Sequence, residues 1–109
     1  MTEEIKVQVG SGNVFADLGL PNSEEMLVKA ELASKIGEII ETRSLTQMDA
    51  AEIIGIDQPK ISALIRGRLT GFSTERLFRF LNALGSDVEI SVKPKPESRT
   101  AAITTVIEN

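Results

Sequence analysis

Side chains that could bind nucleotides are concentrated in the middle of the chain. They are two amides and three cations, Gln47, Gln58, Lys60, Arg66 and Arg68. A glutamine amide can pair with adenine through two hydrogen bonds, a lysine can reach the O6 or N7 atom of guanine, and an arginine can bind a base or a phosphate. These residue types indicate contacts to DNA.

Two short helices joined by a tight turn are predicted to hold these side chains. The hydroxyl of Thr46 can cap the first helix, and Gly55 supplies the left-handed residue that ends it sharply. The carboxylate of Asp57 can cap the second helix, Pro59 suits its first turn, and Gly67 ends it. We therefore expect a helix-turn-helix whose second helix is free to lie in a DNA groove.

One face of the second helix is predicted to meet the DNA. Counting 100° per residue from Ile61, which faces the core, the outward positions are Pro59, Ala63 and Arg66. The small Ala63 lets the backbone approach and can touch a thymine methyl group, while Gln47 at the start of the first helix can bind a phosphate. The predicted DNA-binding residues are Gln47, Gln58, Pro59, Lys60, Ser62, Ala63, Arg66 and Arg68.

Two further helices flank this pair. Helical spacing of apolar residues predicts them over residues 23–43 and 73–84, so that the bundle has four helices. Arg76 and Arg79, on the last helix, are interpreted as part of a solvated face. The side chains expected to face the core are Val28, Leu32, Ile36, Ile39, Ile40, Ala50, Ala51, Ile61, Leu64, Ile65, Leu77, Phe80, Leu81 and Leu84.

Apolar and polar residues alternate over residues 5–9 and 87–93, which is the period of a half-buried strand. A lone strand cannot satisfy its own backbone, so we expect these segments to pair with each other, or the later one to pair with its copy across a dimer axis. Of the two, we favour the dimer. Residues 94–109 form either a disordered or a docking tail. The expected fold is mainly α, a small helical bundle with short terminal strands, divided into a segment 1–22, a DNA-binding domain 23–93 and this tail.

Composition limits the possible chemistry. The chain has 109 residues, enough for one domain, and it contains no cysteine and no histidine. Disulfides, thiolate or imidazole metal sites and the usual nucleophile–base pairs are thereby excluded, so we expect no enzyme, no catalytic residue, no metal site and no cofactor. Short apolar runs and an acidic start predict neither a membrane span nor a signal peptide, and hence a cytoplasmic protein that acts at its operator on the nucleoid.

The charges are unevenly distributed. The whole chain carries −4, but residues 43–80 hold six basic and four acidic groups and are net +2. Residues 1–42 hold three basic and eight acidic groups. A basic centre in an acidic chain fits a DNA-binding module whose other surfaces serve another partner, such as a basic protein.

The stretch from about residue 35 to residue 85 resembles the lambda-repressor-like, or Xre, helix-turn-helix family. Over residues 13–92 the chain also looks like the HigA-type antitoxins of bacterial toxin–antitoxin pairs. The segments that carry this closer resemblance are Asn13–Pro21, Arg66–Leu69, Phe72–Leu77 and Leu84-Gly85. The resemblance implies a homodimer that binds a pseudo-palindromic operator in its own promoter and neutralises a RelE/HigB-like toxin, which the acidic residues 1–42 would cover.

Two functions remain open on the sequence. One is an autorepressing antitoxin, and the other is a phage-type repressor without a toxin partner, which would share the same central motif. A short basic reading frame beside the gene would favour the antitoxin. A small metal or nucleotide enzyme has no supporting set of residues, because the carboxylates of residues 24–41 suit a solvated helix face and Gly10-Ser11-Gly12 is too short for a phosphate loop.

Overall fold

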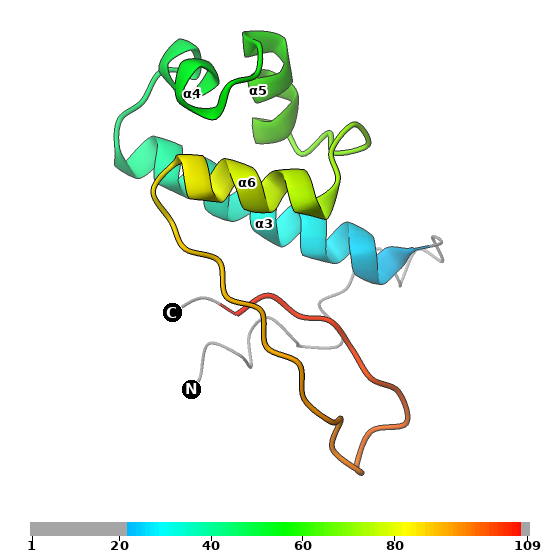
Figure 1. Ribbon diagram of the computed structural model, residues 1–109. Coiled ribbons are helices and arrows are strands. Elements are labelled where there is room, and N and C mark those ends of the chain that lie inside the picture. The colour runs from blue at the N-terminus through cyan, green and yellow to red at the C-terminus, as the bar shows by residue number, and fades with distance from the viewer. Residues whose placement is uncertain (1–21, 108–109) are drawn as a thin grey trace. The chain divides into compact units, whose positions relative to one another are not determined.

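The computed structural model describes residues 22–107, and Figure 1 shows the order of the helices among them. These helices are α3 (Ser23–Thr42), α4 (Gln47–Ile54), α5 (Gln58–Ile65) and α6 (Thr74–Ala83). The predicted four helices are confirmed, with bounds that differ by one or two residues. The chain divides into two units, residues 29–88 and residues 1–28 with 89–109. No helix within residues 22–107 has the length and apolar character needed to cross a membrane.

The ends of α4 and α5 follow from local hydrogen bonds. The Thr46 hydroxyl accepts a bond from the Asp49 N–H at 3.0 Å, and the Asp49 carboxylate accepts one from the Thr46 N–H at 3.2 Å, which together form a capping box. Gly55 ends α4 with φ of 89°, in the left-handed region that a side chain would strain. The carboxylate of Asp57 caps α5 by accepting a bond from the Lys60 N–H at 3.1 Å. The predicted caps Thr46, Gly55 and Asp57 are confirmed, whereas the C-cap of α5 is Arg66, one residue before the predicted Gly67.

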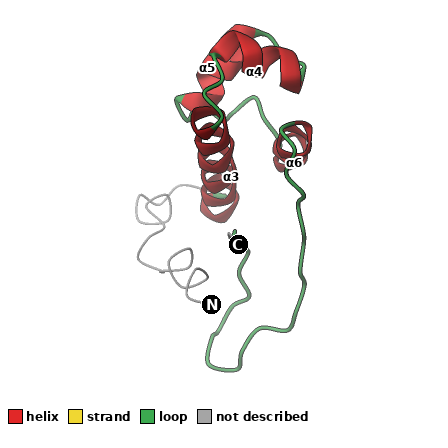
Figure 2. Cartoon of the chain, turned by 90° about the vertical axis from the view of Figure 1, so that its left-hand side faces the viewer, coloured by secondary structure: helices red, strands yellow, loops and turns green. Residues whose placement is uncertain are grey.

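The core of the unit 29–88 is formed by apolar side chains from all four helices. Ala50 and Ala51 are buried, and these small side chains allow α4 to lie close to α5 and α6, which it contacts. Figures 1 and 2 both show α4 and α5 together on one side of α6. The buried residues of this unit are Leu32, Ala33, Ile36, Ile40, Ala50, Ala51, Ile61, Leu64, Phe72, Leu77, Phe80, Leu81 and Leu84.

One residue of the predicted stripe does not reach the core. Ile65, the last residue of α5, is 43% exposed, whereas Ile61 is fully buried and Leu64 is 1% exposed. Ile61 and Leu64 lie one turn apart on the face that meets the other helices. The core therefore takes Ile61 and Leu64 and leaves Ile65 at the surface.

The predicted strand over residues 87–93 is wrong. Residues 86–96 have no regular secondary structure, and no backbone hydrogen bond joins residues 87–95 to another described residue. Two apolar side chains of this segment are exposed, Ile90 at 72% and Val92 at 92%. The alternating pattern was not sufficient because a strand exists only when a second strand pairs with its backbone. The other predicted strand, residues 5–9, lies outside the described residues.

A hydrogen bond joins the tail to the start of α3. The Thr104 N–H donates a hydrogen bond of 2.8 Å to a carboxylate oxygen of Glu24, in the first turn of α3. The carboxylate therefore binds a segment that lies 80 residues further along the chain. This bond agrees with the docking alternative for the tail.

A side chain that follows α3 caps the C-terminal end of α6. Nη1 of Arg43 donates a hydrogen bond of 2.9 Å to the carbonyl oxygen of Leu84, the C-cap residue of α6. Replacing Arg43 with alanine removes this charged donor, so we expect the free energy of unfolding to fall by about 1–2 kcal/mol. Urea titration would measure this loss. Arg79→Ala removes a cation whose partner, Glu75, is exposed, and a loss as large in this control would contradict the capping role.

Candidate nucleic-acid interface

A turn of three residues, 55–57, connects α4 to α5. The N–H groups of Gly55 and Ile56 both donate to the carbonyl oxygen of Ala51, at 2.8 and 3.1 Å. These two bonds close the last turn of α4 and redirect the chain, and the Asp57 cap then starts α5 at once. The local sequence thus produces two helices joined by a tight turn, and the helices pack on each other.

The predicted site residues lie on the accessible side of this pair. Ile61 and Leu64 turn inward, and the side chains between and around them face outward. Seven of the eight predicted residues lie on α5 or within three residues of its end, and Gln47 is the first residue of α4. The exposed members are Gln47, Gln58, Pro59, Lys60, Arg66 and Arg68, and the partly exposed members are Ser62 and Ala63.

The cations of this surface have no acidic partner. Within residues 22–107, no salt bridge involves Lys60, Arg66 or Arg68, whereas Arg79 on α6 pairs with Glu75 at 3.1 Å. An unpaired exposed cation can bind a phosphate without first losing another charged partner. The outer surface of α5 therefore has the electrostatic character that a DNA backbone requires.

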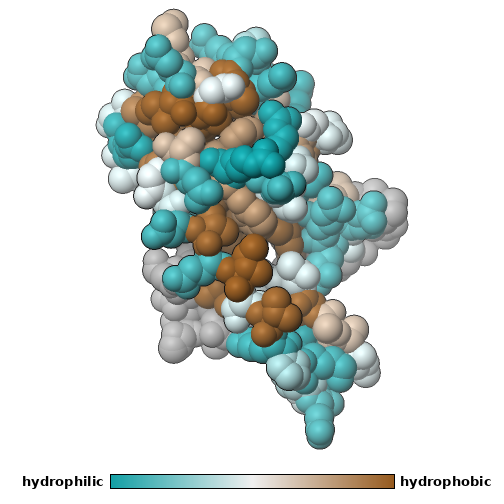
Figure 3. Space-filling model, viewed as in Figure 1, coloured by the Kyte–Doolittle hydropathy of each residue, from teal (hydrophilic) through white to brown (hydrophobic). Residues whose placement is uncertain are grey.

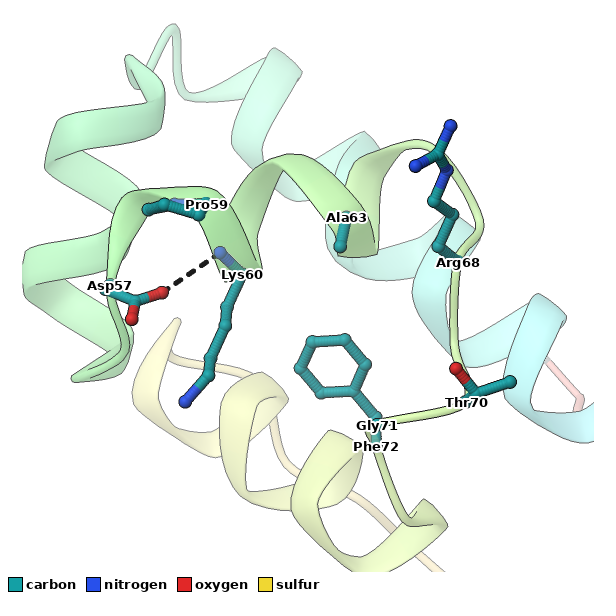
Figure 4. A pocket seen from close by; sticks show the side chains of 8 residues that line it. All are labelled: Asp57, Pro59, Lys60, Ala63, Arg68, Thr70, Gly71 and Phe72. Carbon is teal, nitrogen blue, oxygen red and sulfur yellow. Dashed lines mark hydrogen bonds between the residues drawn. The ribbon is translucent and has the colours of Figure 1, made fainter.

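A cleft of about 370 Å³ lies between α5 and the loop that precedes α6. Lys60 and Arg68 supply positive charge, Thr70 supplies a hydroxyl group, and the ring of Phe72 points toward α5 (Figure 4). Cationic and hydroxyl groups beside an apolar wall suit a sugar-phosphate backbone, which has both characters. The full lining is Asp57, Pro59, Lys60, Ala63, Arg68, Thr70, Gly71 and Phe72.

Sequence reasoning missed the part of this cleft that the loop contributes. Thr70, Gly71 and Phe72 line the cleft, and none of them is among the predicted DNA-binding residues. The position of Arg68 was the available signal for this part of the cleft. Because this cation lies only three residues after the end of α5, the loop that contains it must begin beside that helix. Within residues 22–107, no group of acidic side chains suited to a metal ion comes together.

Arg76, which was interpreted as part of a solvated face, is partly exposed and also contacts the protein. Its guanidinium carbon lies 5.3 Å from the ring centroid of Phe72 and 5.5 Å from that of Phe80. Its Nη1 atom also donates a hydrogen bond of 3.0 Å to the carbonyl oxygen of Gly71. The interpretation holds for Arg79, whose side chain is 66% exposed.

These helices, their glycine turn and the outward face of α5 define a helix-turn-helix protein. A family model described as a helix-turn-helix domain matches residues 14–93, and the chain belongs to this family. A solved structure named "Putative XRE Family Transcriptional Regulator" is similar to this chain, with 46% sequence identity and a TM-score of 0.79. The match covers 82% of this chain and 100% of that chain. No match was found among curated proteins. The chain is therefore an XRE-type helix-turn-helix protein, a family that is not enzymatic.

Proposed function

We propose that this chain is a DNA-binding transcriptional regulator that represses its own promoter and serves as the antitoxin of a type II toxin–antitoxin pair. The observation that carries the DNA-binding part is the outward face of α5, where amide and unpaired cationic side chains follow a helix-turn-helix turn. The N-terminal half of α5 enters the major groove, and Gln58 and Lys60 lie nearest to the base edges. Such a regulator acts at its operator in the cytoplasm.

A homodimer is part of this proposal. Two copies place their α5 helices about 34 Å apart, so the operator is pseudo-palindromic with half-sites about 10 base pairs apart. The exposed apolar side chains of Ile90 and Val92 support a second copy as partner, because water contact with such side chains is unfavourable. Figure 3 shows apolar side chains at the surface of the segment that follows α6.

Aspartate in place of both Ile90 and Val92 is expected to convert the dimer to a monomer. Two carboxylates in an apolar interface lose their hydration and repel their symmetry mates. Sedimentation velocity would report the change in mass, and operator affinity would fall with it. Ile103→Asp, at a residue that is 45% exposed in the tail, is the matched control and should leave the mass unchanged. An unchanged mass in the double variant would contradict this interface.

The toxin-binding part of the proposal rests on charge and resemblance. Residues 1–42 are net −5, with three basic and eight acidic groups, and five of the acidic groups lie on α3. A ribosome-dependent toxin that cleaves mRNA must approach RNA, so its surface is basic. Residues 1–42 have the opposite charge, and they precede the helix-turn-helix pair in the sequence. The same chain can therefore bind DNA and a toxin through different segments.

A gel-shift titration against the DNA upstream of the gene tests this function. The protein is titrated at fixed salt, with and without the product of the adjacent gene. A specific shift that this product tightens or releases would support the antitoxin. A specific shift that is indifferent to the product would leave a regulator without a toxin partner. The absence of any specific shift would overturn the DNA-binding assignment itself.

A further inference from the structure

We infer that Arg76 is a positioning residue for DNA binding, which holds the loop of residues 67–72 in the shape that lets Arg68 and Thr70 meet the DNA backbone. This inference rests on the proposed function. Arg76 lies on α6 and lines no part of the cleft. It acts on the DNA-facing surface only through the loop that it contacts.

The contacts of Arg76 fix its guanidinium group in one place. The buried rings of Phe72 and Phe80 meet edge to face, with centroids 5.9 Å apart and an angle of 82° between their planes. The guanidinium carbon lies 5.3 and 5.5 Å from these two centroids. Its hydrogen bond of 3.0 Å to the Gly71 carbonyl oxygen then attaches the loop to α6. A planar guanidinium can stack and donate at once, which the compact ammonium group of lysine cannot reproduce.

The loop is held at both ends. At its start, the Arg68 N–H donates to the carbonyl oxygen of Ala63 at 2.9 Å, which attaches it to α5. At its end, Arg76 holds Gly71 and Phe72. Between these points the chain makes a turn, closed by a bond of 3.0 Å from the Phe72 N–H to the Leu69 carbonyl oxygen.

The two fixed ends have a consequence for DNA binding. Arg68 and Thr70 lie between them, and both are among the residues that line the cleft. If the end held by Arg76 is released, both side chains become free to move away from these positions. The loop must then be ordered each time DNA binds, and this entropic cost weakens binding.

Arg76→Gln and Arg79→Gln form a matched pair for the test. Each removes one positive charge from α6, so both change the long-range attraction to DNA equally, but only Arg76 contacts the loop. We expect Arg76→Gln to lower operator affinity about tenfold, since it loses one hydrogen bond and two ring contacts. Arg79→Gln should lower it less than about threefold. Fluorescence anisotropy on the full chain at fixed salt would measure both affinities.

A double-mutant cycle with Arg68→Gln separates positioning from a general loss of stability. If Arg76 acts through the loop, the loss from Arg68→Gln is much smaller in the Arg76→Gln background than in the wild type. Full additivity of the two losses, or equal losses from Arg76→Gln and Arg79→Gln, would overturn the inference. If the wild-type chain binds no operator, the proposed function itself fails. If the wild-type chain binds the operator but Arg76 shows none of these effects, only the inference about Arg76 fails.

Arg76→Lys keeps the test decisive if Arg76→Gln does not fold. Lysine preserves the charge and should leave the thermal unfolding midpoint close to that of the wild type. Amide hydrogen exchange of residues 69–72 should nevertheless become faster, because the loop loses its planar donor. Exchange of residues 77–81 of α6 serves as the internal reference. Unchanged exchange in residues 69–72 would contradict a positioning role.

Discussion

Replacement of Lys60 with alanine is expected to weaken binding to the natural operator by about 1–3 kcal/mol. Lys60 is exposed, lies in the first turns of α5 and has no acidic partner within residues 22–107. Its ammonium group can therefore reach a guanine edge in the major groove. A duplex with a different base pair at that position cannot make this contact, so Lys60 contributes to sequence specificity. The measurement is a titration of operator DNA and of a scrambled duplex at the same salt concentration.

Gln47→Ala is the control for this prediction. Gln47 is also exposed, but it is the first residue of α4, where its amide and the free N–H groups of the helix start face a phosphate. Its loss should weaken binding to the operator and to the scrambled duplex alike. If Lys60→Ala shows this same uniform loss, then Lys60 binds a phosphate in the cleft and does not read a base.

Replacement of Ile61 with alanine is expected to lower the free energy of unfolding by about 2–5 kcal/mol. Ile61 has no exposed surface and packs in the core of the unit 29–88, so its truncation leaves a cavity that the neighbouring helices cannot fill completely. This loss is a large fraction of the stability of a small domain, which is about 5–15 kcal/mol. Operator binding should fall with the folded fraction.

Ile65→Ala provides the same substitution on the same helix. Ile65 is 43% exposed, so the variant should lose less than about 1 kcal/mol and keep its α-helical circular dichroism. Urea titration of both variants would measure the difference. Equal losses would mean that α5 rotates about its axis in solution, and the outward positions assigned to Pro59, Ala63 and Arg66 would then be wrong.

The helices and their ends were predictable because their causes lie within a few residues. Thr46, Asp57 and Ser73 each accept a hydrogen bond from an N–H three residues further along. Gly55 supplies a positive φ directly after α4. Such interactions involve few partners and short separations, so residue types at fixed offsets are sufficient to identify them. The outward face of α5 followed for the same reason, since helical geometry places every side chain once the inward residue is known.

The sequence by itself therefore determined the four helices, the turn between α4 and α5, and the exposure of Gln58, Lys60 and Arg66. Only the tertiary structure decided that Ile65 remains exposed and that residues 87–93 have no regular secondary structure. It also decided that the loop before α6 joins the cleft and that the guanidinium group of Arg76 lies near two aromatic rings. These features depend on which surfaces meet, and local residue patterns do not encode a contact between two elements until both have been placed.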